Sequence, residues 1–92
     1  MIGGDSAGAN LAAATIHSSA TAPIAAAWLI SPYLDLTHTG ASVPVRAGRD
    51  PFVDPATMPA TAATYLAGAD AADPRASPLF GDVAGFPPTL IQ

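Results

Sequence analysis

The chain has 92 residues, which is the length of one small domain, and half of its residues are hydrophobic. Because 22 of them are Ala, whose side chain buries little surface, few large apolar side chains are available for a core, and we expect marginal stability when the chain stands alone. Three basic residues against seven acidic ones give a net charge of −4, which excludes nucleic-acid binding, and the absence of Cys excludes disulfides.

The first predicted elements are a strand, a helix and a second strand. Met1 and Ile2 form the stub of a strand, which Gly3 and Gly4 interrupt. Residues 7–18 carry their apolar side chains on one helical stripe, and 18–23 is a predicted connection. Residues 24–30 (IAAAWLI) are continuously apolar, which is typical of a strand buried on both faces of a parallel sheet, with an Ala-rich helix as the alternative. This order predicts a right-handed βαβ unit.

The next segment, 33–54, is predicted to be irregular because Gly and Pro punctuate it. Asp54 as the N-cap and Pro55 as the first helical residue then predict a helix. We expect this helix to end near Leu66, with Gly68 just beyond its last turn.

The last third of the chain is predicted to be a loop over 69–88, held by turn hydrogen bonds and an Asp73–Arg75 pair, followed by another buried strand from 89 to 92. We expect 43–67 to form loop and helix before this final strand. The predicted fold class is therefore α/β.

Residues 4–8 (GDSAG) match the pattern G-x-S-x-G. A serine hydroxyl is a poor nucleophile at neutral pH and needs a base and hydrogen-bond donors for the oxyanion. In a nucleophile elbow the serine lies on a sharp strand-to-helix turn, with small residues beside it and the next N–H directed at the oxyanion. The pattern therefore predicts Ser6 as nucleophile, Ala7 as oxyanion donor, and Gly4 and Gly8 as residues that make room for the turn.

Two further interpretations concern this motif. Asp5 is adjacent to Ser6, so its side chain is expected to point elsewhere and to support the elbow rather than act as the acid. The structural alternative for Ser6 is a helix N-cap, whose hydroxyl satisfies free backbone N–H groups.

Neither histidine is expected to be the base. His17 follows Ser6 on the same predicted helix, about 16 Å along its axis, and we expect it to face solvent. His38 and Asp35 follow Ser6 in the order of some catalytic triads, but we expect Asp35 to order its own loop. No cluster of metal ligands is visible, so no metal or cofactor is expected.

Four segments come in an order that resembles a known family: GGDSAGANLA, ISPYLDLT, DPRASPLF and GFPPTLIQ. They are similar to the hormone-sensitive-lipase-like family of α/β-hydrolase carboxylesterases. The resemblance implies a partial α/β-hydrolase fold with three α/β/α layers and a mostly parallel sheet. It implies hydrolysis of small carboxylic esters through an acyl-enzyme on Ser6, with the N–H of Ala7 at the oxyanion and no cofactor.

The family pattern also places groups outside this sequence. Its HGGG segment precedes the elbow, and its triad acid and His follow the strand that begins near Thr89. We therefore expect residues 1–92 to be a fragment of one catalytic domain, truncated at both ends and inactive alone. The resemblance also implies a cap that lines the acyl pocket, with Phe52, Met58, Tyr65 and Leu66 as its candidate residues. The alternative is that these side chains pack a helix against the core.

Two non-catalytic interpretations of the chain stay open. It is either a truncated remnant or a small interaction module that kept the fold without the chemistry. In either case the exposed edges of a short parallel sheet are expected to favour self-association. The longest apolar run, 22–30, is too short to cross a membrane, and no signal peptide is visible, so we expect a cytoplasmic chain without a membrane span.

Overall fold

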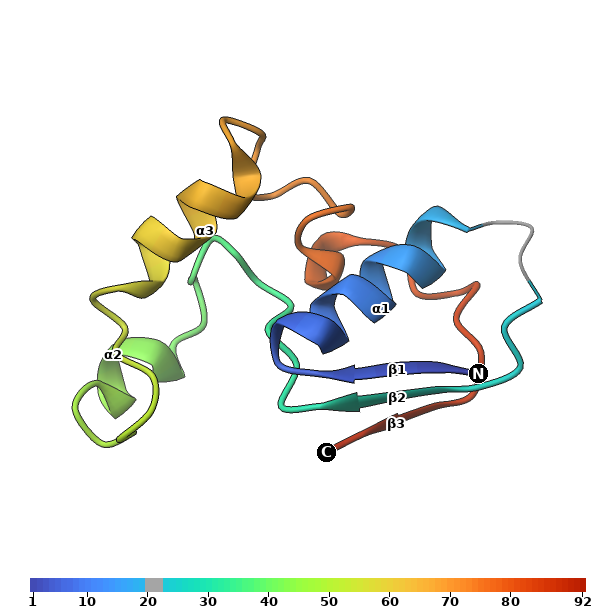
Figure 1. The fold of residues 1–92 in the computed structure, drawn as a ribbon, viewed down its shortest axis with the longest axis horizontal. Coiled ribbons are helices and arrows are strands. Elements are labelled where there is room, and N and C mark those ends of the chain that lie inside the picture. Colours follow the sequence, from blue (N-terminus) through green and yellow to red (C-terminus); the bar gives the residue numbers. More distant parts are fainter. Residues whose placement is uncertain (20–22) are drawn as a thin grey trace.

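Three parallel strands form the centre of the fold, in the order β1-β2-β3 (Figure 1). The computed structural model describes residues 1–19 and 23–92. The strands are β1 (Ile2–Asp5), β2 (Ala27–Ile30) and β3 (Thr89–Ile91). The predicted α/β class is confirmed, and so is a final strand that begins at Thr89. The prediction that this strand is buried is wrong, because Leu90 and Ile91 are exposed at an edge of the described sheet.

The longest helix, α1 (Ala7–Ser18), connects β1 to β2 and lies across one face of the sheet, as predicted (Figure 1). Two further helices, α2 (Ser42–Arg46) and α3 (Met58–Leu66), lie beyond the carboxyl ends of the strands. A 3₁₀ turn, η1 (Pro78–Phe80), packs near α1. No helix within the described residues combines the length and hydropathy that a membrane crossing requires.

Strand β1 continues through both glycines, so the prediction that Gly3 and Gly4 interrupt it is wrong. Neither position has room for a side chain, because neighbouring atoms lie too close to the backbone. A Cβ added to Gly3 would lie 2.2 Å from the ring of Trp28, and one added to Gly4 would lie 2.3 Å from the carbonyl carbon of Gly8. The glycines thus allow the Trp28 ring on one face and α1 on the other to touch the strand.

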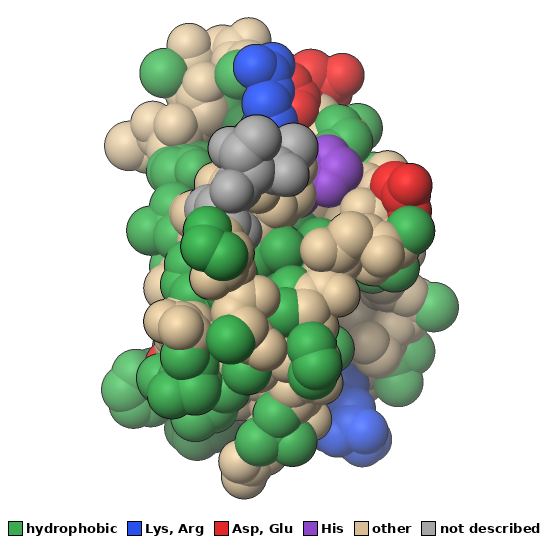
Figure 2. Space-filling model, turned by 90° about the vertical axis from the view of Figure 1, so that its right-hand side faces the viewer, with side chains coloured by type: hydrophobic (Ala, Val, Ile, Leu, Met, Phe, Trp, Pro, Cys, Tyr) green, Lys and Arg blue, Asp and Glu red, His purple; other side chains and the backbone are tan. Residues whose placement is uncertain are grey.

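The burial of β2 alternates along the strand, so the prediction of burial on both faces is wrong. Ala27 and Leu29 lie under α1, and Leu29 is only 2% exposed. Trp28 and Ile30 point to the other face and are each 38% exposed, because the described residues place no helix there. The described residues therefore form two layers, the sheet and the helix on one of its faces. Figure 2 shows hydrophobic side chains over much of the side of the molecule that it presents.

Helix α3 starts later than predicted. Asp54 does not cap it, because its carboxylate accepts the N–H of Ala56 at 2.9 Å in a preceding turn, and Met58 is the first helical residue. The predicted end is confirmed: Leu66 is the last helical residue, and Gly68 beyond it has a φ of 92°. The predicted strand over 24–30 begins only at Ala27, and the short α2 and η1 lie in segments that were expected to be irregular.

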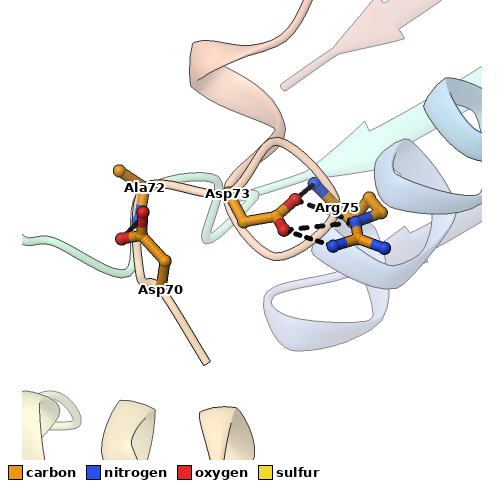
Figure 3. A network of polar contacts seen from close by, with 4 residues as sticks. All are labelled: Asp70, Ala72, Asp73 and Arg75. Carbon is orange, nitrogen blue, oxygen red and sulfur yellow. Dashed lines mark hydrogen bonds and ion pairs between the residues drawn. The ribbon is translucent and has the colours of Figure 1, made fainter. Parts of the chain in front are cut away.

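Aspartate side chains hold the loop after α3 (Figure 3). Asp70 accepts the N–H of Ala72 at 2.9 Å. Asp73 accepts the N–H of Arg75 at 2.9 Å and pairs with its guanidinium at 2.6 Å, which confirms the predicted ion pair. The hydrogen bond from the Arg75 side chain is the main cause that lowers the pKa of Asp73 to about 2.

Candidate active site

Ser6 forms the sharp turn between β1 and α1. Its φ of 51° and ψ of −116° lie outside the regions that residues with a side chain normally adopt. The backbone around it is held firmly: its N–H donates to the carbonyl of Ile30 at 2.9 Å, and its own carbonyl accepts N–H groups from Ala9, Asn10 and Tyr33. Strained conformations persist only where the surroundings enforce them, and they cluster at functional sites.

The hydroxyl of Ser6 does not cap helix α1, which was the structural alternative to a catalytic role. Ser6 occupies the N-cap position of α1, yet its side chain makes no capping hydrogen bond and the residue is exposed. The following residue, Ala7, opens the helix and is also exposed. Its N–H belongs to the first turn, where backbone donors lack partners within the helix and the helix dipole favours negative charge.

The two elbow glycines differ in their surroundings. Gly4 is required by sterics, because the backbone of Gly8 and Ala9 lies against it. A Cβ on Gly8 would meet no described atom within 4 Å, so the predicted need for room is not found at this position. Asp5 ends β1 with its side chain exposed.

A cavity of about 540 Å³ opens beside Ser6. Its wall comes from the start of α1, from the loop after β2, and from the segment between α2 and the end of α3. The lining residues are Ser6, Ala7, Asn10, Leu11, Ser31, Pro32, Tyr33, Leu36, Phe52, Val53, Asp54, Thr57, Met58, Thr61, Ala62 and Tyr65. The site lies at the carboxyl edge of a parallel sheet, where α/β proteins bind their ligands.

The four residues that were expected to belong to a cap do not all lie at the cavity. Phe52, Met58 and Tyr65 line the cavity. Leu66 instead packs against the small core of Leu36, Ala62 and Ala76, which joins α3 to the loops around it. The apolar lining suits the hydrocarbon part of a ligand.

Neither histidine lines the cavity, in the part of the chain that the structure describes. His17 was expected to face solvent, but it is half-buried: a Cβ added to Gly81 would lie 2.7 Å from its ring, so the imidazole packs on that glycine. The His38 ring stacks on Tyr33 and contacts its hydroxyl through Nε2. Burial also raises the pKa of the Tyr33 hydroxyl, with a smaller contribution from the charge of Asp35.

Asp35 orders its loop, as expected. One carboxylate oxygen accepts the N–H of Thr37 at 2.8 Å and the other accepts the N–H of Thr39 at 2.9 Å, and both hydroxyls add further bonds. Burial alone would raise the pKa of Asp35, but these hydrogen bonds outweigh it and lower the pKa. The carboxylate therefore serves the loop and does not line the cavity.

Among the cavity residues that sequence reasoning missed are Asn10, Ser31 and Tyr33. Asn10 is buried and hydrogen-bonded to two loops, Ser31 lines the wall with a φ of 42°, and Tyr33 contacts the nucleophile turn through its N–H. The available signal was the position of Asn10, a polar residue among the small side chains of the helix stripe. Nothing local in the sequence marks Ser31 or Tyr33.

Comparison with known proteins gives a consistent result. The family described as alpha/beta hydrolase fold matches residues 1–92. An acetyl-hydrolase of Streptomyces hygroscopicus is 47% identical over 99% of this chain and 31% of its own length. An esterase of Acinetobacter venetianus is 41% identical over the whole chain and 32% of its own length.

Solved structures agree with these sequence matches. EstE5, in crystals soaked with ethyl alcohol, is 46% identical with a TM-score of 0.91, and an esterase from the bacterial hormone-sensitive lipase family is 40% identical with the same TM-score. In both cases the match covers 98% of this chain and 31% of the solved one, so the chain spans about a third of these proteins. Because the family match extends over all 92 residues and the folds superpose closely, this chain belongs to the hormone-sensitive-lipase-like family of alpha/beta hydrolases.

Proposed function

We propose that this chain supplies the nucleophile of a serine-dependent carboxylic ester hydrolase. The hydroxyl of Ser6 attacks the ester carbonyl carbon, its proton passes to a general base, and the alcohol leaves to give an acyl-enzyme. Water then attacks the acyl group and releases the acid. The N–H of Ala7 donates to the oxyanion that develops in both steps.

The observation that carries this proposal is the state of Ser6. It combines a strained backbone, an exposed side chain without a capping bond, and a place in the wall of an apolar cavity. A serine that only capped the helix would need neither the strain nor the cavity. The names of the relatives, an acetyl-hydrolase and an esterase, point to the same chemistry.

The base and its acid partner must come from elsewhere. Within the described residues the cavity wall holds no histidine, and Asp54 is its only carboxylate. We propose that the His, the acid and the remaining oxyanion donors lie in segments of the family fold that these 92 residues do not include. The 92 residues alone are then expected to hydrolyse no ester.

The cavity also suggests the kind of ester. Phe52, Met58 and Tyr65 surround it with apolar groups, and its volume of about 540 Å³ accommodates a small ligand. We propose a small-molecule ester with an acyl chain of modest length. EstE5 crystals have been soaked with p-nitrophenyl butyrate, which provides a suitable test substrate.

A hybrid enzyme tests the proposal. Residues 1–92 replace the matching segment of EstE5, and hydrolysis of p-nitrophenyl butyrate is measured. We expect turnover that Ser6→Ala lowers by about 10⁴-fold or more, because no other group replaces the nucleophile. Ser31→Ala is the matched control, since Ser31 lines the same cavity. Turnover that survives Ser6→Ala, or a folded hybrid with no turnover, contradicts the proposal.

For the 92 residues taken alone, the uncovered surfaces of the sheet favour self-association as a second role. The sheet face with Trp28 and Ile30 and the free edges of β1 and β3 have no cover among the described residues. We propose that the isolated chain is non-catalytic and associates with other copies through these surfaces.

A further inference from the structure

We infer that Asn10 is a positioning residue that holds the cavity wall against the nucleophile turn and so keeps Ser6 in its strained conformation. This inference rests on the proposed function of Ser6. It concerns a side chain that lies in the wall of the cavity and that neither the motif nor the hydrolysis scheme requires.

The side-chain amide of Asn10 joins three segments that are far apart in sequence. Asn10 is 4% exposed, and its Nδ2 donates to the carbonyl of Tyr33 at 2.7 Å and to the carbonyl of Ala76 at 2.9 Å. Both N–H groups of the amide are thereby used. Tyr33 belongs to the loop after β2, and Ala76 to the loop after α3. One uncharged group therefore ties both loops to the first turns of α1.

The same residues close a ring of hydrogen bonds around Ser6. The backbone N–H of Asn10 donates to the Ser6 carbonyl at 3.1 Å, and the N–H of Tyr33 donates to that carbonyl at 3.3 Å. The carbonyl of Tyr33 in turn accepts a hydrogen bond from the side-chain amide of Asn10, which closes the ring. Any movement of Tyr33 away from α1 therefore loosens the peptide group of Ser6 directly.

This ring matters because the conformation of Ser6 does not maintain itself. A side-chain-bearing residue with its φ and ψ relaxes toward an ordinary region unless its neighbours prevent it. The hydrogen bond from Tyr33 to Ser6 is one such restraint, and the Asn10 amide fixes the position of Tyr33. A shift of about 1 Å in a reacting group costs about 100-fold in rate.

The donor pattern explains why the residue is Asn. Leu has nearly the same shape but leaves the carbonyls of Tyr33 and Ala76 without their donor. Asp has the same shape again, but its ionised form places negative charge against two carbonyl oxygens. Only the protonated form of Asp donates, and it donates one bond instead of two.

Ser77 offers a matched control. It is the other buried polar residue among the described residues, 0% exposed, and its Oγ accepts the N–H of Leu36 at 2.8 Å and donates to the carbonyl of Ala71 at 2.6 Å. Ser77→Ala thus breaks one buried hydrogen bond between two loops and a second one within the loop after α3. Like Asn10→Leu it removes two side-chain hydrogen bonds, but neither of them involves α1 or Ser6.

The experiment compares these variants in the EstE5 hybrid by kcat, KM and melting temperature. We expect both Asn10→Leu and Ser77→Ala to lower the melting temperature, but only Asn10→Leu to lower kcat by about 100-fold, with KM changing less. For Asn10→Asp, the kcat relative to the unsubstituted hybrid should fall as pH rises, because the carboxyl loses the proton that it donates.

The outcomes separate the two proposals. If the unsubstituted hybrid shows no Ser6-dependent turnover, the proposed function fails, and the positioning role fails with it. If the hybrid turns over and Asn10→Leu lowers kcat no more than Ser77→Ala does, only the positioning role is overturned. A ratio for Asn10→Asp that stays constant with pH also contradicts it, because shape alone would then suffice.

Discussion

At the scale of a single residue, the backbone of Ser6 is held in a conformation that costs stability. Its φ of 51° and ψ of −116° are enforced by hydrogen bonds to Ile30 and Tyr33. Conformations of this kind cost about 1–3 kcal/mol in residues with a side chain, whereas glycine adopts them readily. The motif therefore retains a serine where the backbone alone would favour glycine.

Ser6→Gly is expected to stabilise the fold relative to Ser6→Ala. Both variants lack the Ser6 hydroxyl, but only glycine relieves the strain, so the free energy of unfolding should be larger for Ser6→Gly by about 1 kcal/mol. Urea denaturation of the two hybrids, followed by circular dichroism, measures the difference. Equal midpoints would show that the turn is not strained.

At the scale of elements, the contact between β1 and α1 depends on one glycine. Gly4→Ala places a Cβ against the backbone of Gly8, which no side-chain rotation relieves, and overpacking of this kind costs about 1–3 kcal/mol. Gly8→Ala is the control: its Cβ meets open space, and Ala favours a helix over Gly by about 1 kcal/mol. Thermal unfolding should therefore rank Gly8→Ala above the unsubstituted hybrid and Gly4→Ala below it. The reverse order would contradict this account of the elbow.

The loop after α3 should show a pH-dependent contribution to stability. The pKa of Asp73 is lowered from 3.8 to about 2, so folding favours the ionised form. The contribution is complete above 3.8 and is lost as pH falls toward 2. Asp73→Asn lacks it. The difference in melting temperature between the unsubstituted hybrid and Asp73→Asn should thus be constant from about pH 6 to about pH 4 and shrink below that. A difference that grows on acidification would contradict the ion pair.

The elements also show how far sequence reasoning reaches. Helix α1 was predicted with its observed bounds because twelve residues suffice to show a helical stripe. The five residues of α2 and the three of η1 are too short for any period to appear, and local turn bonds such as the one from Val43 to Gly40 hold this region. Ser6 was singled out as the candidate nucleophile because the chemistry proposed for it needs a local sequence pattern. Asn10 was missed because its partners lie 23 and 66 residues away.

At the scale of the whole molecule, the two faces of the sheet differ in how far they are covered. Of its two faces, the one beneath α1 is covered, and the other carries Trp28, Ile30 and the more exposed Leu90. Among residues 1–19 and 23–92 no segment covers this second face, which explains why β2 alternates in burial although its sequence is continuously apolar. A continuous run predicts cover on both faces, but sequence cannot say which residues provide it.

The isolated chain is expected to associate in solution. Trp28→Lys together with Leu90→Lys places charge on the uncovered face and should raise the monomer fraction. Sedimentation velocity over a concentration series measures this fraction. The matched control, Val45→Lys with Val83→Lys, changes two exposed valines outside the sheet and should leave association unchanged. Equal effects of the two pairs would show that association does not involve the sheet.

The central claim, that Ser6 is the nucleophile, is tested most directly by covalent labelling. A fluorophosphonate reacts with an activated serine, and mass spectrometry of the digested EstE5 hybrid locates the adduct. We expect one adduct, on the peptide that contains Ser6, and none on the peptide with Ser31, which lines the same cavity. An adduct on Ser31, or labelling that persists in Ser6→Ala, would contradict it.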